Sequence, residues 1–186
     1  MIRFLLGCFF LSLVLAVNAQ QERNLDADFL TQADLLGDAS LGSNNAVTID
    51  QVGNENEAEI IQEQQYLQAN QALVIQQGDE NYAQLVQTGG NNDVILLQYG
   101  SDNTYRLDLV GSNNDIAVIQ NGDQNEINQR LIDSRNVNIE FIQNGDGNLI
   151  EHQADGLISK DIKVLQTGSN MQVIINQTTA LPPSGN

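Results

Sequence analysis

Amide side chains recur at a fixed spacing through most of this sequence. The first copy of the pattern, N-x5-Q-x-G-x2-N-x-A-x3-Q, runs from Asn45 to Gln62. An amide both donates and accepts hydrogen bonds, so identical amides lying one above another bond as a continuous column. The first glutamine of the pattern recurs as Gln51, Gln76, Gln98, Gln120, Gln143 and Gln166. We predict that these side chains form one such column.

An asparagine and a glycine keep the same frame. The asparagine five residues after the glutamine recurs as Asn56, Asn81, Asn103, Asn125 and Asn148, and Met171 replaces it in the last copy. The glycine two residues after the glutamine recurs as Gly53, Gly78, Gly100, Gly122, Gly145 and Gly168. Glycine adopts positive φ without steric penalty, so we predict a tight turn at each of these positions. The asparagines are predicted to join the amide ladder.

Residues suited to catalysis or metal binding are few. His152 is the only histidine, and the repeat pattern places it inward beside Ile150 and Ala154, which predicts a partly buried structural role. Asp79, Asp123 and Asp146 share one turn position, where a stacked calcium site is the alternative to ordinary acidic turns. The repeat length is not that of the nine-residue calcium coils. We therefore predict no catalytic residue, no metal site and no cofactor.

The spacing of the frame indicates a repeat architecture. Successive first glutamines are 25, 22, 22, 23 and 23 residues apart. Residues at steps of two share one face of a strand, so both strands of a unit present aliphatic residues flanked by amides. A plain meander of hairpins gives identical residues no reason to recur, whereas a coil stacks them. The sequence therefore predicts an all-β fold, a β-solenoid of six strand-turn-strand repeats with two parallel sheets.

The outward face of the first strand carries an apolar stripe. It consists of Ile75, Leu97, Ile119, Ile142 and Leu165, with Asp50 in the first copy. An exposed stripe of this kind is typical of an interface, so it is expected to receive either the 25–36 segment or a neighbouring fibre. The alternative is that branched residues simply favour strands.

The segments outside the repeats have their own signatures. Residues 1–19 have a basic start, an apolar run and small residues before a break, which predicts a signal peptide. Residues 20–44 contain helical spacing over 25–36, where a short amphipathic helix and a disordered acidic leader stay open. Residues 178–186 are predicted to be a flexible tail. Cys8, the only cysteine, lies in the leader, so no disulfide is expected.

Composition excludes several classes of partner. The formal net charge is −17, which argues against nucleic acid and anionic membranes. Trp is absent and, after the leader, the only phenylalanines are Phe29 and Phe141, so stability is expected from backbone pairing and stacked ladders. No strong cap is evident at either end, and open strand edges template further strands. Acidic residues in the first repeat and Lys160 and Lys163 in the last favour head-to-tail addition.

The six copies from Asn45 to Gln177 resemble the curlin repeat of bacterial curli fibres. This resemblance implies a secreted amyloid fimbrium or pilus-like subunit that leaves a Gram-negative cell through an outer-membrane curli secretion pore with accessory factors. Such a subunit polymerises with itself and other curlins on the cell surface for biofilm matrix and adhesion, and it is not an enzyme. Residues 20–44 then correspond to the export segment.

Departures from the pattern leave the subunit type open. Leu109, Leu131 and Ala154 replace the closing glutamine. The last repeat, with Lys160, Lys163 and Met171, is similar to the final repeat of the minor, nucleating curlin. Both the major type and the nucleator stay open. The alternatives from other classes are a monomeric solenoid adhesin and a solenoid enzyme acting on polysaccharide, which needs clustered outer carboxylates and a groove.

Overall fold

The structure, a computed structural model, describes residues 12–14, 44–65, 68–156 and 161–178. Throughout these ranges the regular secondary structure is β-strand. The possible helix over 25–36 lies outside the described residues. Thr178, assigned by the sequence to the tail, is the last residue of a strand, and residues 179–186 lie outside the description. The described residues include no helix long and apolar enough to cross a membrane.

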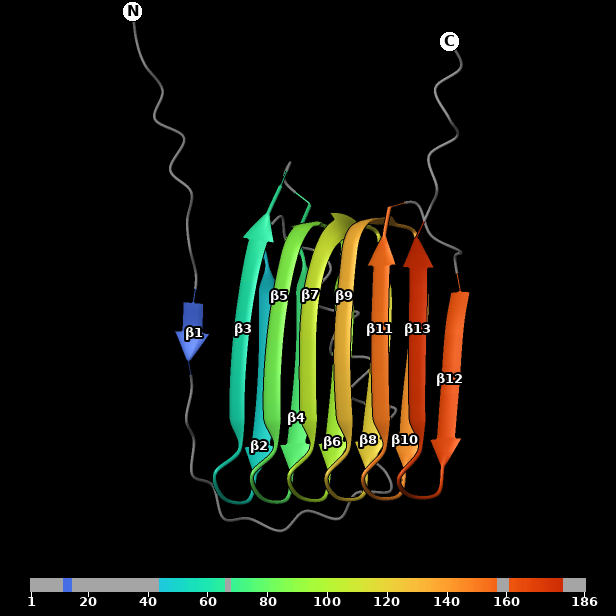
Figure 1. The fold of residues 1–186 in the computed structure, drawn as a ribbon. Coiled ribbons are helices and arrows are strands. Elements are labelled where there is room, and N and C mark those ends of the chain that lie inside the picture. The colour runs from blue at the N-terminus through green and yellow to red at the C-terminus, as the bar shows by residue number, and fades with distance from the viewer. Residues whose placement is uncertain (1–11, 15–43, 66–67, 157–160, 179–186) are drawn as a thin grey trace, which may run out of the picture.

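Strands β2 to β13 form successive strand-turn-strand units, which we call rungs (Figure 1). The first strands of the six rungs are β2 (Ala46–Val52), β4 (Gln71–Gln77), β6 (Asp93–Tyr99), β8 (Asp115–Asn121), β10 (Asn138–Asn144) and β12 (Asp161–Thr167). The second strands are β3 (Glu57–Gln64), β5 (Tyr82–Gly90), β7 (Thr104–Ser112), β9 (Glu126–Arg135), β11 (Leu149–Asp155) and β13 (Gln172–Thr178).

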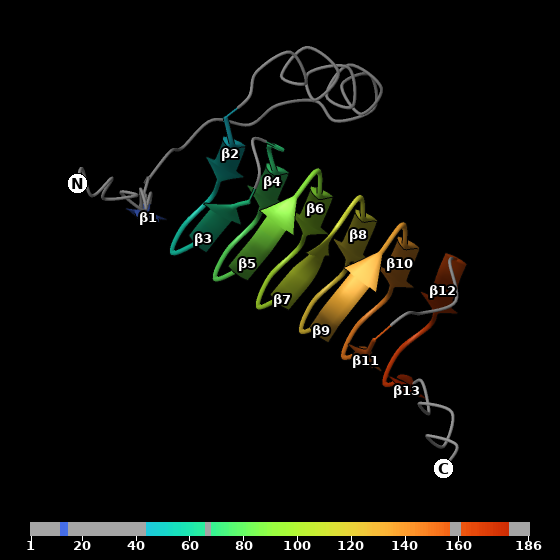
Figure 2. The same ribbon diagram turned by 90° about the horizontal axis from the view of Figure 1, so that it is seen from above.

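The two kinds of strand separate into two layers (Figure 2). The even-numbered strands form a six-stranded sheet in the order β12-β10-β8-β6-β4-β2, and the odd-numbered strands form the other sheet. Neighbouring rungs are parallel in both sheets. This parallel pairing excludes a hairpin meander and confirms the predicted β-solenoid with two parallel sheets.

The two edges at the first rung differ. A three-residue strand, β1 (Ser12–Val14), pairs antiparallel with β3. These residues belong to the predicted leader, so in the full chain the edge of β3 is not bare, in contrast to the uncapped end expected from the sequence. Strands β2, β12 and β13 are the other sheet edges.

The core is a thin aliphatic layer between the sheets. Inward residues alternate along each strand, as in the pattern of Asp115–Asn121, where Ile116, Val118 and Gln120 are buried. Tyr105 and Phe141 are the bulkiest fully buried side chains among the described residues. Each fully buried aliphatic side chain stabilises the fold by about 1.5–3 kcal/mol. Because the amides occupy the two margins of this layer, the core also fixes where the amide columns run.

Candidate functional site

The first glutamines of all six rungs form one hydrogen-bonded column. The register pairs each glutamine with the next. Each Nε2 donates to Oε1 one rung further along the chain, at 2.6 Å for Gln51 to Gln76 and at 2.8, 2.8, 3.1 and 2.9 Å for Gln76 to Gln98, Gln98 to Gln120, Gln120 to Gln143 and Gln143 to Gln166. Every donor in the column therefore points toward the C-terminal rung.

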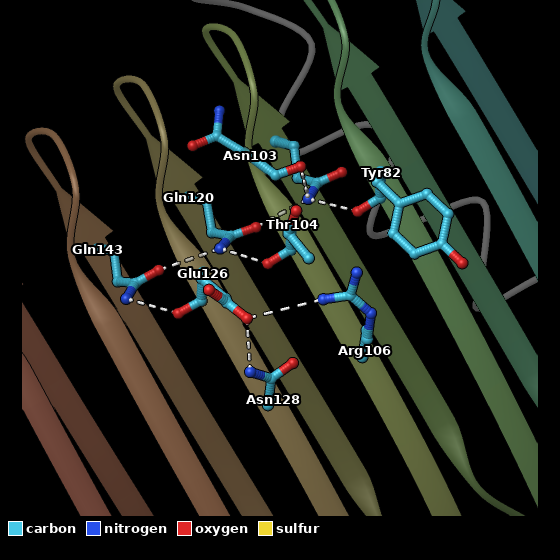
Figure 3. A network of polar contacts seen from close by, with 9 residues as sticks. Tyr82, Asn103, Thr104, Arg106, Gln120, Glu126, Asn128 and Gln143 are labelled. Atoms are coloured by element: carbon cyan, nitrogen blue, oxygen red, sulfur yellow. Dashed lines mark hydrogen bonds and ion pairs between the residues drawn. The ribbon is translucent and has the colours of Figure 1, made fainter.

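The same amides tie the two sheets together (Figure 3). The Nε2 of Gln120 also donates to the backbone oxygen of Thr104 at 3.0 Å. In the same way, the Nε2 of Gln143 donates to the backbone oxygen of Glu126 at 3.2 Å. These glutamines are fully buried, so an unmade bond here costs about 1–3 kcal/mol. The column is thus a structural element of the core margin.

The ends of the glutamine column are incomplete. The Oε1 of Gln51 is buried and has no hydrogen-bond partner in the part of the chain that the structure describes. At the other end, the Nε2 of Gln166 donates to the backbone oxygen of Leu149 at 3.3 Å, and β12 is the edge strand of its sheet. One extremity therefore presents an unused acceptor, while the other presents an amide whose second N–H has no further rung to bind.

The asparagine column runs in the opposite sense. Each Nδ2 donates to Oδ1 one rung back, at 3.0 Å for Asn81 to Asn56 and at 3.0, 3.1 and 3.1 Å for Asn103 to Asn81, Asn125 to Asn103 and Asn148 to Asn125. Met171 ends the side-chain column, although its backbone N–H still donates to Asn148 at 3.1 Å. The last rung therefore keeps the backbone bond and loses the amide.

A second asparagine column, which was not predicted from the sequence, runs at the opposite turn. Asn92 donates to Asn70 at 2.9 Å and Asn114 donates to Asn92 at 2.8 Å, while the backbone N–H of Asn70 donates to Asn45 at 2.9 Å. All four asparagines stand six residues before a column glutamine, so the leading asparagine of the pattern was the available signal. This column ends at Val137, whose backbone N–H donates to Asn114 at 3.2 Å.

The six turn glycines stack above one another. All six have φ between 110° and 127°. A Cβ on Gly78 would overlap the carbonyl oxygen of Gly100, and one on Gly100 would overlap that of Gly122. Gly168 differs, because the nearest atom to an added Cβ is Cε of Met171 at 3.7 Å. Inside the solenoid the next rung forbids a side chain, while at the last rung only the backbone conformation does.

The stacked aspartates bind backbone groups. Asp79 accepts from the N–H of Asn54 at 2.8 Å, and Asp123 accepts from that of Ser101 at 2.8 Å. Asp146 accepts in the same way from Asp123 at 2.9 Å. Within the described ranges, no group of three or more His, Cys, Asp or Glu residues is placed to hold a metal ion. These carboxylates act as turn caps between rungs.

His152 lies in the core and faces Phe141 edge-on, with ring centroids 5.7 Å apart. Only 2% of its surface is exposed, and neither ring nitrogen has a hydrogen-bond partner among the described residues. Burial lowers the pKa of His152 from 6.5 to about 4, so the ring is neutral at pH 7. Its neighbour in the sheet, Gln129, accepts from the Tyr105 hydroxyl at 3.0 Å.

The outer face of the odd-numbered sheet carries charges of both signs. Arg106 lies 3.7 Å from Glu126, and its guanidinium stands 5.1 Å from the centre of the Tyr82 ring (Figure 3). Asp108 lies 3.7 Å from Arg130 beside a shallow hollow of about 500 Å³. About half of each charged side chain is exposed, so these pairs contribute little stability. Two of the outer carboxylates that the enzyme alternative needs, Asp108 and Glu126, are here paired with arginines.

The apolar stripe lies on the outer face of the even-numbered sheet. The sequence analysis expected it to be exposed along its length, but Ile75 and Leu97 are only 7% and 3% exposed. Ile119 and Ile142 are half-buried, and Leu165 is 59% exposed. The stripe is therefore covered at its N-terminal end and open at its C-terminal end.

Parallel rungs, glycine turns and amide columns define the class of this protein, a β-solenoid whose stacking depends on identical residues in successive rungs. The family model described as curlin associated repeat matches residues 41–63 and 78–107, which include most of the first three rungs. These matches support membership of the curlin family, which consists of extracellular structural fibre subunits. No curated protein matches the chain.

Proposed function

We propose that this protein is a secreted subunit of a curli-type amyloid fibre, which polymerises end to end outside a Gram-negative cell and contributes to biofilm matrix and adhesion. The observation that carries the proposal is the incomplete glutamine column. In a second copy stacked in register, Gln51 stands one rung beyond Gln166. The free N–H of Gln166 then meets the buried, unpartnered Oε1 of Gln51, because both follow the same donor direction.

The last glutamine of the repeat pattern supports the same head-to-tail contact between copies. Its column reads Gln62, Gln87, Leu109, Leu131, Ala154 and Gln177 through the six rungs. Gln62 donates to Gln87 at 2.7 Å, whereas Gln177 has a buried Oε1 without a partner. Head-to-tail stacking places Gln177 beside Gln62 of the next copy. The two ends that meet therefore both carry the amide that the middle of the column lacks.

The asparagine column tolerates the junction. Met171 offers no acceptor to Asn56 of a following copy, but the Nδ2 of Asn56 already donates to the backbone oxygens of Val52 at 3.2 Å and Gly78 at 2.7 Å. Backbone pairing at the open edges of β12 and β13 supplies the remaining contacts. Head-to-tail addition thus leaves the Nδ2 of Asn56 paired.

The proposal is tested by the variant Gln166→Glu. The carboxylate still accepts from Gln143, but it has no N–H to donate to Gln51 of the next copy. The contact between copies then loses one hydrogen bond and brings two acceptors face to face, which costs about 1–3 kcal/mol. We therefore expect elongation to be roughly ten- to hundred-fold slower. The matched control, Thr167→Glu, adds the same charge at the neighbouring exposed position. Equal elongation rates for the two variants, measured by seeded growth followed by light scattering, would contradict the junction.

A nucleating role within the same family is the second candidate. It is favoured by the last rung, where Met171 interrupts the asparagine column and makes this end unlike the inner rungs. Incubation of the purified chain with a major curlin from the same cell separates the roles. Acceleration of the partner at low molar ratio supports the nucleator, whereas growth of the chain alone without such acceleration supports the major type. A monomer that stays soluble for days supports the adhesin alternative.

A further inference from the structure

One end of the outer face of the even-numbered sheet is covered. Leu73, Ile75 and Leu97, which we call the covered patch, are between 3% and 7% exposed. They form an apolar cluster of their own, separate from the core, with Ile95, Tyr99 and Ile119 packed against it. A second apolar cluster therefore lies on the side of this sheet that faces away from the solenoid interior.

The position of a rung in the stack does not explain this burial. Leu97 and Ile142 occupy the same column and each has a paired strand on both sides. Leu97 is nevertheless buried, while Ile142 is half-buried. Two polar neighbours of the patch follow the same trend, because burial raises the pKa of Asp93 and that of Tyr99. The burial is local to the second and third rungs.

The cover of the patch does not come from the second sheet of the solenoid. The odd-numbered sheet packs on the inner face of the even-numbered sheet, whereas the patch lies on the outer face, so the odd-numbered sheet cannot reach it (Figure 2). The segment before β2 has the required chemistry, since Leu25, Phe29, Ala33 and Leu36 recur at helical spacing. The eight residues between Leu36 and Asn45 span up to about 26 Å when extended, and β6 lies about 10 Å from β2.

We propose that the segment 25–36 docks across the covered patch through its apolar residues, as an intramolecular brace on the N-terminal rungs. The contact is apolar, because both the segment and the neighbouring face, with Asp93 and Asp115, are acidic. Docking hides Ile75 and Leu97 and leaves Ile142 and Leu165 open. This inference is independent of polymerisation, since it concerns one chain and a face parallel to the fibre axis.

Single cysteines measure the coverage directly. In a Cys8→Ser background, Ile75→Cys and the matched control Ile142→Cys are alkylated with iodoacetamide, with rates normalised to the same variants in urea. We expect Cys at 75 to react at least ten-fold more slowly than Cys at 142. Deletion of residues 25–36, or the single change Phe29→Asp in the full-length chain, should abolish the difference. An unchanged difference in both variants would overturn the proposal.

The leader and a neighbouring molecule are separated by two further measurements. A chain that starts at Gln20 keeps the slow reaction if 25–36 is the cover, and loss of protection in that chain would assign the cover to the leader instead. In the pair Phe29→Cys with Ile75→Cys, we expect a disulfide within one chain, seen as a monomer on a non-reducing gel. Disulfide-linked dimers as the main product would place the segment on a neighbouring copy and contradict an intramolecular brace.

Discussion

The amide of Gln143 donates to Gln166 at 2.9 Å, and Gln166 is the last member of its column. Each inner glutamine has two column neighbours, whereas Gln166 has one. A change at an inner glutamine should therefore affect the folding of one subunit, whereas a change at Gln166 should affect the joining of two subunits.

An inner column glutamine should matter for folding. In Gln98→Leu, Gln76 loses an acceptor and Gln120 loses a donor. We expect the urea unfolding free energy to fall by about 1–3 kcal/mol, since Gln76 keeps its bonds to backbone oxygens. The control is Gln153→Leu, at an exposed outer position of β11. A loss of the same size in both variants would show that the column bond is not the cause.

Two glycines of one stack should respond differently to the same change. Gly100→Ala places a methyl group on the carbonyl oxygen of Gly122, so we expect it to prevent correct folding. Gly168→Ala meets no such contact, and it carries only backbone strain of about 1–3 kcal/mol. Its methyl group would nevertheless stand where Gly53 of a following copy belongs. We expect a folded monomer, checked by circular dichroism, that fails to extend at its C-terminal end. Normal elongation of this variant would argue against stacking in register.

The free energy of unfolding should fall as the pH is lowered, because His152 is buried as a neutral ring. The folded-state pKa is about 4 and the ordinary value is 6.5, so on acidification the unfolded chain binds a proton before the folded chain does. The stabilisation is complete above pH 6.5 and is lost as the pH falls to about 4, by about 3 kcal/mol in total.

The variant His152→Leu isolates this effect. Burial and Asp115 raise the pKa of Asp93, and the carboxylate of Asp102 raises that of Glu80, so these two acids favour the folded state at low pH. They are present in both proteins and cancel in the comparison. We expect the difference in unfolding free energy between the variant and the parent chain to grow between pH 6.5 and about 4. A constant difference would mean that His152 titrates normally.

The charged ends should influence growth kinetics. Lys163 lies 2.7 Å from Glu140, and the pair is exposed, so its loss should hardly change monomer stability. The first rung carries Glu55, Glu57 and Glu59, and a cation at the last rung draws these ends together in solution. Lys163→Glu should slow elongation at low ionic strength and should approach the parent rate at high salt. A rate defect that is independent of salt would point to a contact effect.

The sequence predicted most of the fold because the stacking itself imposes the repeat. A column such as Gln76, Gln98 and Gln120 requires the same residue once per rung, and the glycine stack forbids any side chain, so both constraints appear as a period. The column at Asn70 and Asn92 left a weaker signal, because the leading asparagine recurs in only the first four copies and is replaced by Val137 and Lys160 in the last two.

Other properties of the site are not encoded in the period. The direction of each column depends on how the amides are oriented, which a single letter does not record. The burial of Leu97 relative to Ile142 departs from the period, since the two residues occupy the same column. The inward position of His152 follows from strand alternation, whereas its missing hydrogen-bond partners follow from the packing of neighbouring side chains.

The opposite senses of the glutamine and asparagine columns have an electrostatic consequence. Each amide is a small dipole, and a single column would add these dipoles along the axis, so that its total dipole moment would grow with length. Here the Gln98 amide points its N–H one way and the Asn103 amide points its N–H the other way. The two arrays therefore oppose each other, and their combined dipole moment grows less with filament length than that of either column alone.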